Sequence, residues 1–179
     1  MSDSYIESFE IFDNPQDDTI AFVVDDDNNG KWNIAINLSV HQQSDYKEQK
    51  ATLIHELSHI ITLNHDQIDA SLGRCITYEA DEWCTKINSY INQFYQKFRK
   101  SLPKQPWFDK NMFVTEYAIT SPEEDIAESF AFFVLESNHN NSSTRNSKVN
   151  FFNSYPELIA IRNEMRNTLT KNTLKLKKY

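Results

Sequence analysis

Glycine, proline and basic residues are scarce in this chain of 179 residues, and each shortage excludes a class of protein. Two glycines and five prolines are too few for a collagen-like or linker-like chain and for most turn-rich all-β folds. No apolar run approaches the roughly 20 residues of a membrane-spanning helix, so we expect no membrane span. Acidic residues outnumber basic ones by 26 to 18, and the net charge of −8 predicts no nucleic-acid partner.

Aromatic residues, by contrast, are abundant, with 12 Phe, 8 Tyr and 3 Trp. A disordered chain has few such residues, because their rings supply the apolar area that a core buries. The length suits one domain with a sizeable core and is short for two. We therefore expect residues 1–179 to form a single domain and the protein to be a monomer. The first residues show no basic stretch followed by an apolar one, so we expect no signal peptide.

The two cysteines, Cys75 and Cys84, lie nine residues apart. This spacing does not fit a structural zinc site or a C-x-x-C redox pair. The residues themselves leave two alternatives open. The cysteines form a short disulfide if the protein lives outside the cytosol, or they are two buried thiols inside it.

A β-hairpin is predicted near the N-terminus. Residues 19–24 are β-branched and apolar, and apolar positions alternate with polar ones over 31–38, as is typical of strands. The Asp- and Asn-rich segment 25–30 ends in Asn-Gly and predicts the turn between them. Residues 1–18 are acidic and polar, and Asn14-Pro15 and Asp17-Asp18 indicate turns within them.

Helical patterns follow the hairpin. Asp45 and Glu48 match a capping box at the start of a segment in which apolar residues recur every three or four positions up to Ile61. Ser121 followed by Pro122 is typical of another helix start. An aromatic stripe from Trp83 to Phe98 predicts a helix whose rings lie in the core. The predicted helices span 45–61, 80–100, 121–136 and 156–170, with an irregular segment over 101–120 and an exposed loop over 137–147.

A metal-binding motif lies inside the first predicted helix. His55-Glu56-Leu57-Ser58-His59 matches H-E-x-x-H. The spacing puts both imidazoles on one helical face, where they can share a tetrahedral metal ion. Glu56 stands beside them, where a carboxylate can take the proton of a metal-bound water. The alternative is an ordinary helix with two histidines and a surface glutamate, but the apolar surroundings of the motif favour metal binding.

A catalytic zinc ion needs a third protein ligand, and His65 is one candidate. It lies six residues after His59, at the spacing of the third histidine in metzincins. That family requires a glycine with positive φ where this chain has Thr62, and a β-branched residue adopts such a conformation at a high cost. The sequence therefore disfavours His65.

Glu124, in the helix predicted over 121–136, is the second candidate for the third ligand. Glu128 follows one helical turn later on the same face, where its carboxylate can orient a metal ligand. Glu124 also stands where it can complete a capping box with Ser121. From spacing alone, ligand and cap remain comparable alternatives.

Together these residues resemble a known group of peptidases. The H-E-x-x-H motif at 55–59, followed by Tyr117, Glu124 and Glu128, resembles the gluzincin-type peptidases related to anthrax lethal factor and the Pro-Pro endopeptidases. In those families a tyrosine stands seven residues before the glutamate ligand, and a second glutamate often follows four residues after it.

A further resemblance is to a group of predicted bacterial zinc peptidase domains. The shared features are the segment 52–59, the two cysteines and an aromatic helix like that at 89–95. The match covers about residues 50–135. Ser58 stands where many relatives have glycine, and a small residue still fits there. This resemblance favours a secreted protein with a Cys75–Cys84 disulfide.

The gluzincin resemblance implies a role for each residue. Glu56 acts as general base on a zinc-activated water, and Tyr117 donates a hydrogen bond to the oxyanion. Glu128 orients one of the ligands. The implied ligands of a single Zn²⁺ ion are His55, His59 and Glu124.

The expected fold is α+β and zincin-like, with a small twisted β-sheet packed on the H-E-x-x-H helix and further helices toward the C-terminus. The expected function is a zinc-dependent metalloendopeptidase that hydrolyses a peptide or protein substrate. Three alternatives remain: an inactive zinc-binding module that recognises a partner, a structural domain with an accidental motif, and a metzincin-type peptidase that uses His65.

Overall fold

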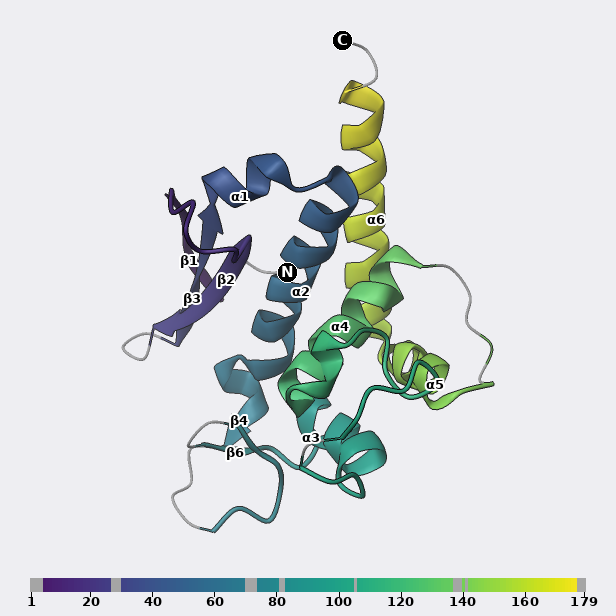
Figure 1. Ribbon diagram of the computed structural model, residues 1–179. Coiled ribbons are helices and arrows are strands. Elements are labelled where there is room, and N and C mark those ends of the chain that lie inside the picture. The colour runs from purple at the N-terminus through teal and green to yellow at the C-terminus, as the bar shows by residue number, and fades with distance from the viewer. Residues whose placement is uncertain are drawn as a thin grey trace.

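The computed structural model describes residues 5–26, 30–69, 74–80, 83–104, 106–136, 140 and 142–176. Within them a three-stranded sheet, a second sheet of very short strands and several helices form a mixed fold (Figure 1). The α+β class predicted from the sequence is confirmed. None of the described helices combines the length and apolar character needed to cross a membrane.

The larger sheet contains β1 (Ile6–Phe12), β2 (Ala21–Asp26) and β3 (Lys31–Asn37) in the order β1-β3-β2. β2 and β3 pair antiparallel, which confirms the predicted hairpin, although residues 27–29 of its turn lie outside the described residues. β1 pairs parallel to β3 and is a strand that the sequence analysis did not predict. β1 is an edge strand with mostly exposed side chains, and for that reason its sequence lacks a buried alternating pattern.

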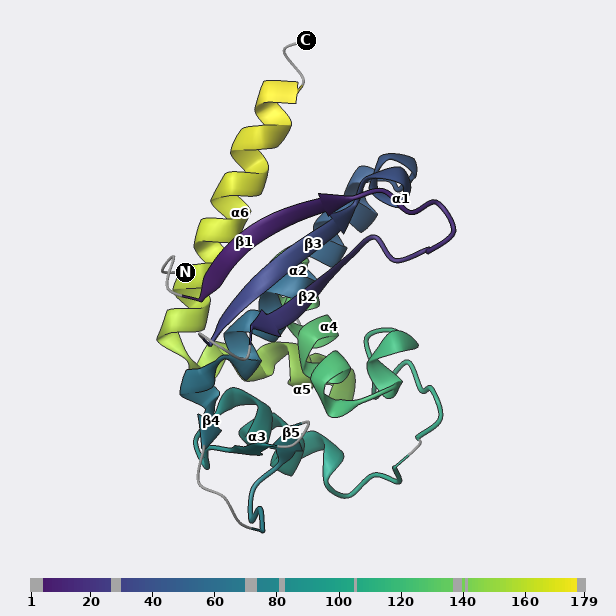
Figure 2. The same ribbon diagram turned by 90° about the vertical axis from the view of Figure 1, so that its left-hand side faces the viewer.

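The sheet lies against α2 (Tyr46–Leu63), the helix that carries the H-E-x-x-H motif (Figure 2). α2 follows the short α1 (Leu38–Gln43) and begins where predicted, because Asp45 accepts hydrogen bonds from the backbone N–H groups of residues 47 and 48. Trp32 and Ile34 of β3 pack with Ile60 of α2 in a buried cluster.

The other face of α2 packs against the helical part of the molecule, whose core is rich in phenylalanine. The rings of Phe130 and Phe152 lie 5.2 Å apart, with Phe94 beside Phe152, and all three are fully buried. This core explains the high aromatic content of the chain. Besides α2, the helices that contribute to it are α3 (Tyr90–Phe94), α4 (Pro122–Leu135), α5 (Thr144–Phe151) and α6 (Pro156–Leu176).

The helix predicted over 80–100 is shorter than the aromatic stripe suggested. α3 begins only after Ser89, whose hydroxyl caps the N–H of Asn92, and it continues into a π-helical turn, η2 (Tyr95–Arg99). Trp83 lies in a strand instead, and Ile87 is 74% exposed outside the core. The physical reason is that this strand, β6 (Trp83–Thr85), pairs with both β4 (Ile68–Asp69) and β5 (Glu79–Ala80).

A disulfide joins Cys84, in the central strand β6 of this small sheet, to Cys75. Of the two alternatives for the cysteines, the structure therefore contains the disulfide.

The predicted loop over 137–147 is also corrected, because α5 begins at Thr144. Ser143 caps this helix by accepting the N–H of Asn146 at 3.1 Å. Its polar sequence hid it, since Lys148 occupies a fully buried position that a periodicity argument reserves for apolar residues. α4 and α6 begin after Ser121 and at Pro156, as predicted, and α6 extends to Leu176.

Candidate metal centre

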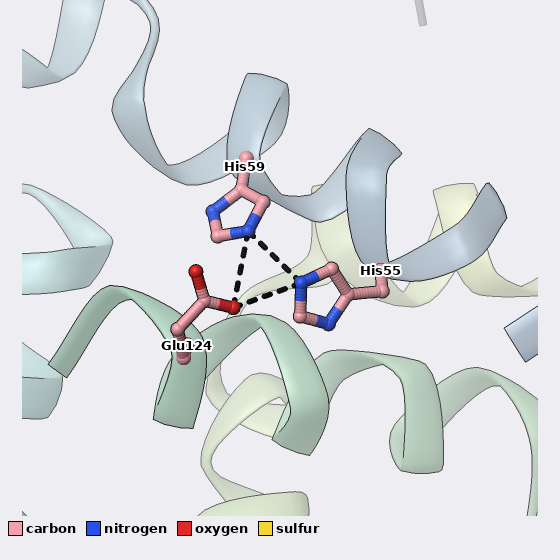
Figure 3. Close-up of side chains that lie close together, drawn as sticks. All are labelled: His55, His59 and Glu124. Atoms are coloured by element: carbon pink, nitrogen blue, oxygen red, sulfur yellow. Dashed lines mark hydrogen bonds and ion pairs between the residues drawn. The ribbon is translucent and has the colours of Figure 1, made fainter. Parts of the chain in front are cut away.

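Two helices that are far apart in the sequence bring three potential ligands together. α2 supplies His55 and His59, α4 supplies Glu124, and the three side chains converge where the helices pack (Figure 3). The two Nε2 atoms are 3.0 Å apart, and Glu124 Oε2 lies 2.9 Å from His55 Nε2 and 3.5 Å from His59 Nε2. In the part of the chain that the structure describes, these are the side chains of His, Cys, Asp or Glu that gather closely enough to hold a metal ion.

The position of Glu124 is compatible with both alternatives that its spacing left open. Its backbone N–H donates to Ser121 Oγ at 3.1 Å, which caps the first turn of α4. Its carboxylate does not return to the cap but points toward the two histidines (Figure 3). The start of the helix thus fixes the backbone of Glu124, and the side chain remains available as a ligand.

Glu128 lies one turn further along α4 and contacts the opposite side of the His55 ring. Its Oε1 is 2.6 Å from His55 Nδ1. A carboxylate that accepts the Nδ1–H of a histidine fixes the tautomer, so that the lone pair of Nε2 is directed at a metal. The structure therefore places Glu128 where the sequence predicted a supporting group.

One observation tests directly whether a metal ion fits. Glu124 Oε2 is buried and makes no hydrogen bond of acceptable geometry, in spite of its short distance to His55 Nε2. A buried carboxylate oxygen without a hydrogen bond is unfavourable unless a cation neutralises it. Two imidazole nitrogens and one carboxylate oxygen around a common point are also a typical donor set for a transition metal. The residues present fit a bound cation.

The charges of the site favour a cation in the same place. Burial lowers the pKa of His55, but the close carboxylates of Glu124 and Glu128 outweigh burial and raise it to about 9. Burial raises the pKa of Glu124, but the close positive charge of the His55 and His59 rings outweighs this and lowers it to about 2. In the metal-free chain, a protonated His55 between two carboxylates thus supplies the positive charge.

Glu56 lies at the edge of the group and is itself buried. Burial raises the pKa of its carboxyl group, while the two histidines and a hydrogen bond from the backbone of Val23 lower it. A carboxylate whose pKa lies above its usual range is better suited to accept a proton at neutral pH than an ordinary surface glutamate.

Tyr117 lines the same cavity as Glu56 and lies beside the ring of His55. It lies in η3 (Tyr117–Ile119), just before α4, and its ring centroid is 5.8 Å from that of His55. Burial raises the pKa of its phenol, and the charges of Glu124 and Glu56 raise it further. The hydroxyl is therefore protonated at neutral pH and can donate a hydrogen bond.

An open cavity of about 490 Å³ lies over these groups. Its walls come from the sheet, α2, η3 and α4. Glu123 contributes to one wall and accepts a hydrogen bond from the Tyr78 hydroxyl at 2.6 Å. The sequence analysis assigned no role to Glu123, and no local pattern reveals one, because Tyr78 lies 45 residues earlier in the chain.

The structure does not bring His65 to this group. His65 lies in η1 (His65–Gln67) after the end of α2, and its side chain is 59% exposed. Its Nε2 is 3.3 Å from Asp66 Oδ1, and its ring contacts Tyr5. The group of potential ligands contains Glu124 in its place.

Comparison of the chain with protein-family models, with curated proteins and with solved structures finds no match. The interpretation of the site therefore depends on the geometry of its own residues.

Proposed function

We propose that this protein is a zinc-dependent metalloendopeptidase of the gluzincin type, with a zincin-like fold. The observation that carries the proposal is the convergence of His55 and His59 with Glu124, whose buried Oε2 has no hydrogen bond, beneath an open cavity. Two histidines and a glutamate are a ligand set of catalytic zinc sites that leave one coordination position open.

Each group around the proposed zinc ion has a chemical role. Zinc, when bound by the three ligands, acidifies a water molecule and polarises the carbonyl group of the scissile bond. Glu56 takes a proton from the attacking water and delivers it to the nitrogen of the leaving amine as the C–N bond breaks. Tyr117 donates a hydrogen bond to the oxygen of the former carbonyl, and Glu128 holds the ring of His55 in place.

The edge of the sheet supports a peptide as substrate. Asn37 N–H donates to Ile20 O at 2.9 Å, so the hydrogen-bonded pairs of this ladder are 20 with 37 and 22 with 35. The residues between them, Ala21 and Val23, consequently direct their backbone groups away from β3, and the hydrogen bond from Val23 to Glu56 agrees with this direction.

This outward edge lies beside the proposed zinc ion. β2 is the last strand of its sheet among the described residues, and Ala21, Phe22 and Val23 line the cavity. An extended peptide can pair with such an edge through its main chain, which places one of its carbonyl groups over the ligands. A small amide would leave this edge without a partner, so the geometry favours a polypeptide.

Metal content and hydrolysis test the proposal together. We expect about one zinc ion per wild-type chain after reconstitution, and a marked loss in Glu124→Ala. The Glu56→Gln variant should keep its zinc and lose hydrolysis of a peptide library, whereas His65→Ala should keep both. Absence of zinc from the wild type would refute the metal site. A Glu56→Gln variant as active as the wild type would refute the role of Glu56, and zinc without hydrolysis in the wild type would favour the inactive partner-recognition module.

A further inference from the structure

Arg99 is a buried cation that contacts the chain at two places, directly after Tyr117 and directly after Glu124. It ends η2, and its side chain is only 4% exposed. Its Nη1 donates to Ala118 O at 3.2 Å and to Asp125 Oδ2 at 3.4 Å, and its Nη2 donates to Ile119 O at 3.2 Å. Two of these acceptors directly follow Tyr117, and the third directly follows Glu124.

The local charge balance explains why Arg99 binds the backbone as well as the carboxylate. Lys148 Nζ donates to the same Asp125 Oδ2 at 2.6 Å, and both of these side chains are fully buried. Two buried cations thus share one carboxylate, and a buried surplus charge requires further acceptors. The ring of Phe113 faces Lys148 Nζ at 3.8 Å, and the two carbonyl groups of η3 accept from Arg99.

The other hydrogen bonds of the η3 backbone are local, while the side chain of Tyr117 also bonds to Glu124. Thr115 Oγ1 accepts the N–H of Ala118, and Thr120 Oγ1 donates to the carbonyl of Tyr117. Tyr117 itself is 54% exposed, so packing constrains its side chain only partly. Arg99 reaches η3 from 19 and 20 residues earlier in the chain and ties it to the helical core.

We propose that Arg99 is a positioning residue of the site. By binding the carbonyl groups of Ala118 and Ile119 and the carboxylate of Asp125, it fixes the Tyr117 hydroxyl relative to Glu124. Its consequence for catalysis rests on the proposed peptidase function. A lysine at this position keeps the positive charge but lacks the planar fork that binds several acceptors at fixed angles.

A double-mutant cycle on the zinc-loaded protein tests this role. We expect Arg99→Lys to lower kcat by about 10- to 100-fold with KM changed by less than about twofold, at unchanged zinc content. Tyr117→Phe should lower kcat as well, and adding Arg99→Lys to it should have little further effect, because the hydroxyl to be positioned is already gone. Arg162→Lys, whose guanidinium lies over the ring of Phe133, is the matched control and should leave kcat unchanged. Additive losses in the double variant would overturn the proposal.

A second readout does not depend on hydrolysis. In protein with ¹³C-labelled tyrosines, the ring resonance that disappears in Tyr117→Phe belongs to Tyr117. We expect this resonance to shift and broaden in Arg99→Lys and to stay unchanged in Arg162→Lys. If the wild type hydrolyses no peptide, the proposed function fails, while this measurement still decides whether Arg99 positions Tyr117. An unchanged Tyr117 resonance in Arg99→Lys would refute that role.

A variant with a different charge covers the case in which Arg99→Lys does not fold by circular dichroism. Arg99→Gln removes the surplus buried charge and leaves Lys148 and Asp125 as a one-to-one pair. It also removes the fork that binds η3, so the same change in kcat and in the Tyr117 resonance is expected. A normal Tyr117 resonance in Arg99→Gln would contradict the proposal in the same way.

Discussion

At the scale of single residues, Glu128 determines which nitrogen of His55 is available to a metal. Its carboxylate holds Nδ1 at 2.6 Å, so Nε2 faces His59 and Glu124. A histidine without such a partner samples two tautomers and several ring orientations, and only some of them direct a lone pair at the site. In the proposed site, Glu128 would thus contribute to metal affinity without being a ligand.

Replacing Glu128 tests this contribution. We expect Glu128→Ala to weaken zinc binding by about 10- to 100-fold, the usual effect of losing a carboxylate behind a ligating histidine. Competition with a chromophoric chelator measures the affinity. Glu164→Ala, which removes an exposed carboxylate on α6, is the matched control and should bind zinc like the wild type. Equal affinities of the Glu128 and Glu164 variants would show that Glu128 does not orient His55.

At the scale of elements, the helix that carries both histidines begins at a charged cap. The backbone N–H groups of Glu48 and Lys47 donate to Asp45 and lower the pKa of its carboxyl group below the usual value of 3.8. Because the folded pKa is lower than the unfolded one, the ionised cap stabilises the folded state above the unfolded pKa. That contribution is lost as the pH falls through the folded pKa.

The pH dependence of stability tests this cap. Asp45→Asn retains a capping oxygen but does not titrate. We expect the unfolding free energy of the wild type, relative to Asp45→Asn, to fall between about pH 5 and pH 3 and to stay constant above this range. Urea unfolding followed by circular dichroism at each pH gives the difference. The expected sign would be contradicted if the unfolding free energy of the wild type rose relative to that of Asp45→Asn as the pH falls.

The elements that were predictable from the sequence are those fixed by neighbours along the chain. Asp45 and Ser121 each bind N–H groups two or three residues ahead, and both helix starts were predicted correctly. The start of α3 at Ser89 depends on the same chemistry, but the aromatic stripe upstream of it concealed the competing strand. β1 pairs with β3, and β6 pairs with β4, which lies well before it in the chain. The periodicity of a segment's own residues does not reveal such a partner.

In the candidate site, too, the residues fixed by near neighbours along the chain were predictable, and those fixed by distant partners were not. His55 and His59 were predicted to lie together because their distance is set within one helix, and the structure confirms it. The position of Glu124 beside them followed from the resemblance to gluzincins, because its spacing suited a cap equally well. Arg99 was missed entirely, since its partners lie 19 to 26 residues further along the chain and only the packed fold brings them together.

At the scale of the whole molecule, a metal ion in this site would connect two parts of the chain. α2 packs on the sheet and α4 packs in the aromatic core, and the ligands come from both (Figure 1). An ion that binds only when these helices are docked favours the folded state by mass action.

Zinc should therefore stabilise the whole fold. At a free zinc concentration of about 100 times its Kd, the expected gain in unfolding free energy is about 2.7 kcal/mol. Differential scanning calorimetry with and without zinc measures it as a rise in Tm. Glu124→Ala, which retains the α2 histidines alone, should show a much smaller rise. An identical rise in both proteins would indicate zinc binding elsewhere.

The outward edge of β2 also has a consequence for solubility. Unpaired backbone groups beside exposed apolar side chains such as Phe22 are a template for strand addition between copies, the first step of aggregation. In this chain the edge is short, and three consecutive aspartates, Asp25 to Asp27, follow its apolar part. Like charges at the end of a strand oppose intermolecular pairing, so the aspartates at the end of β2 disfavour strand addition at this edge.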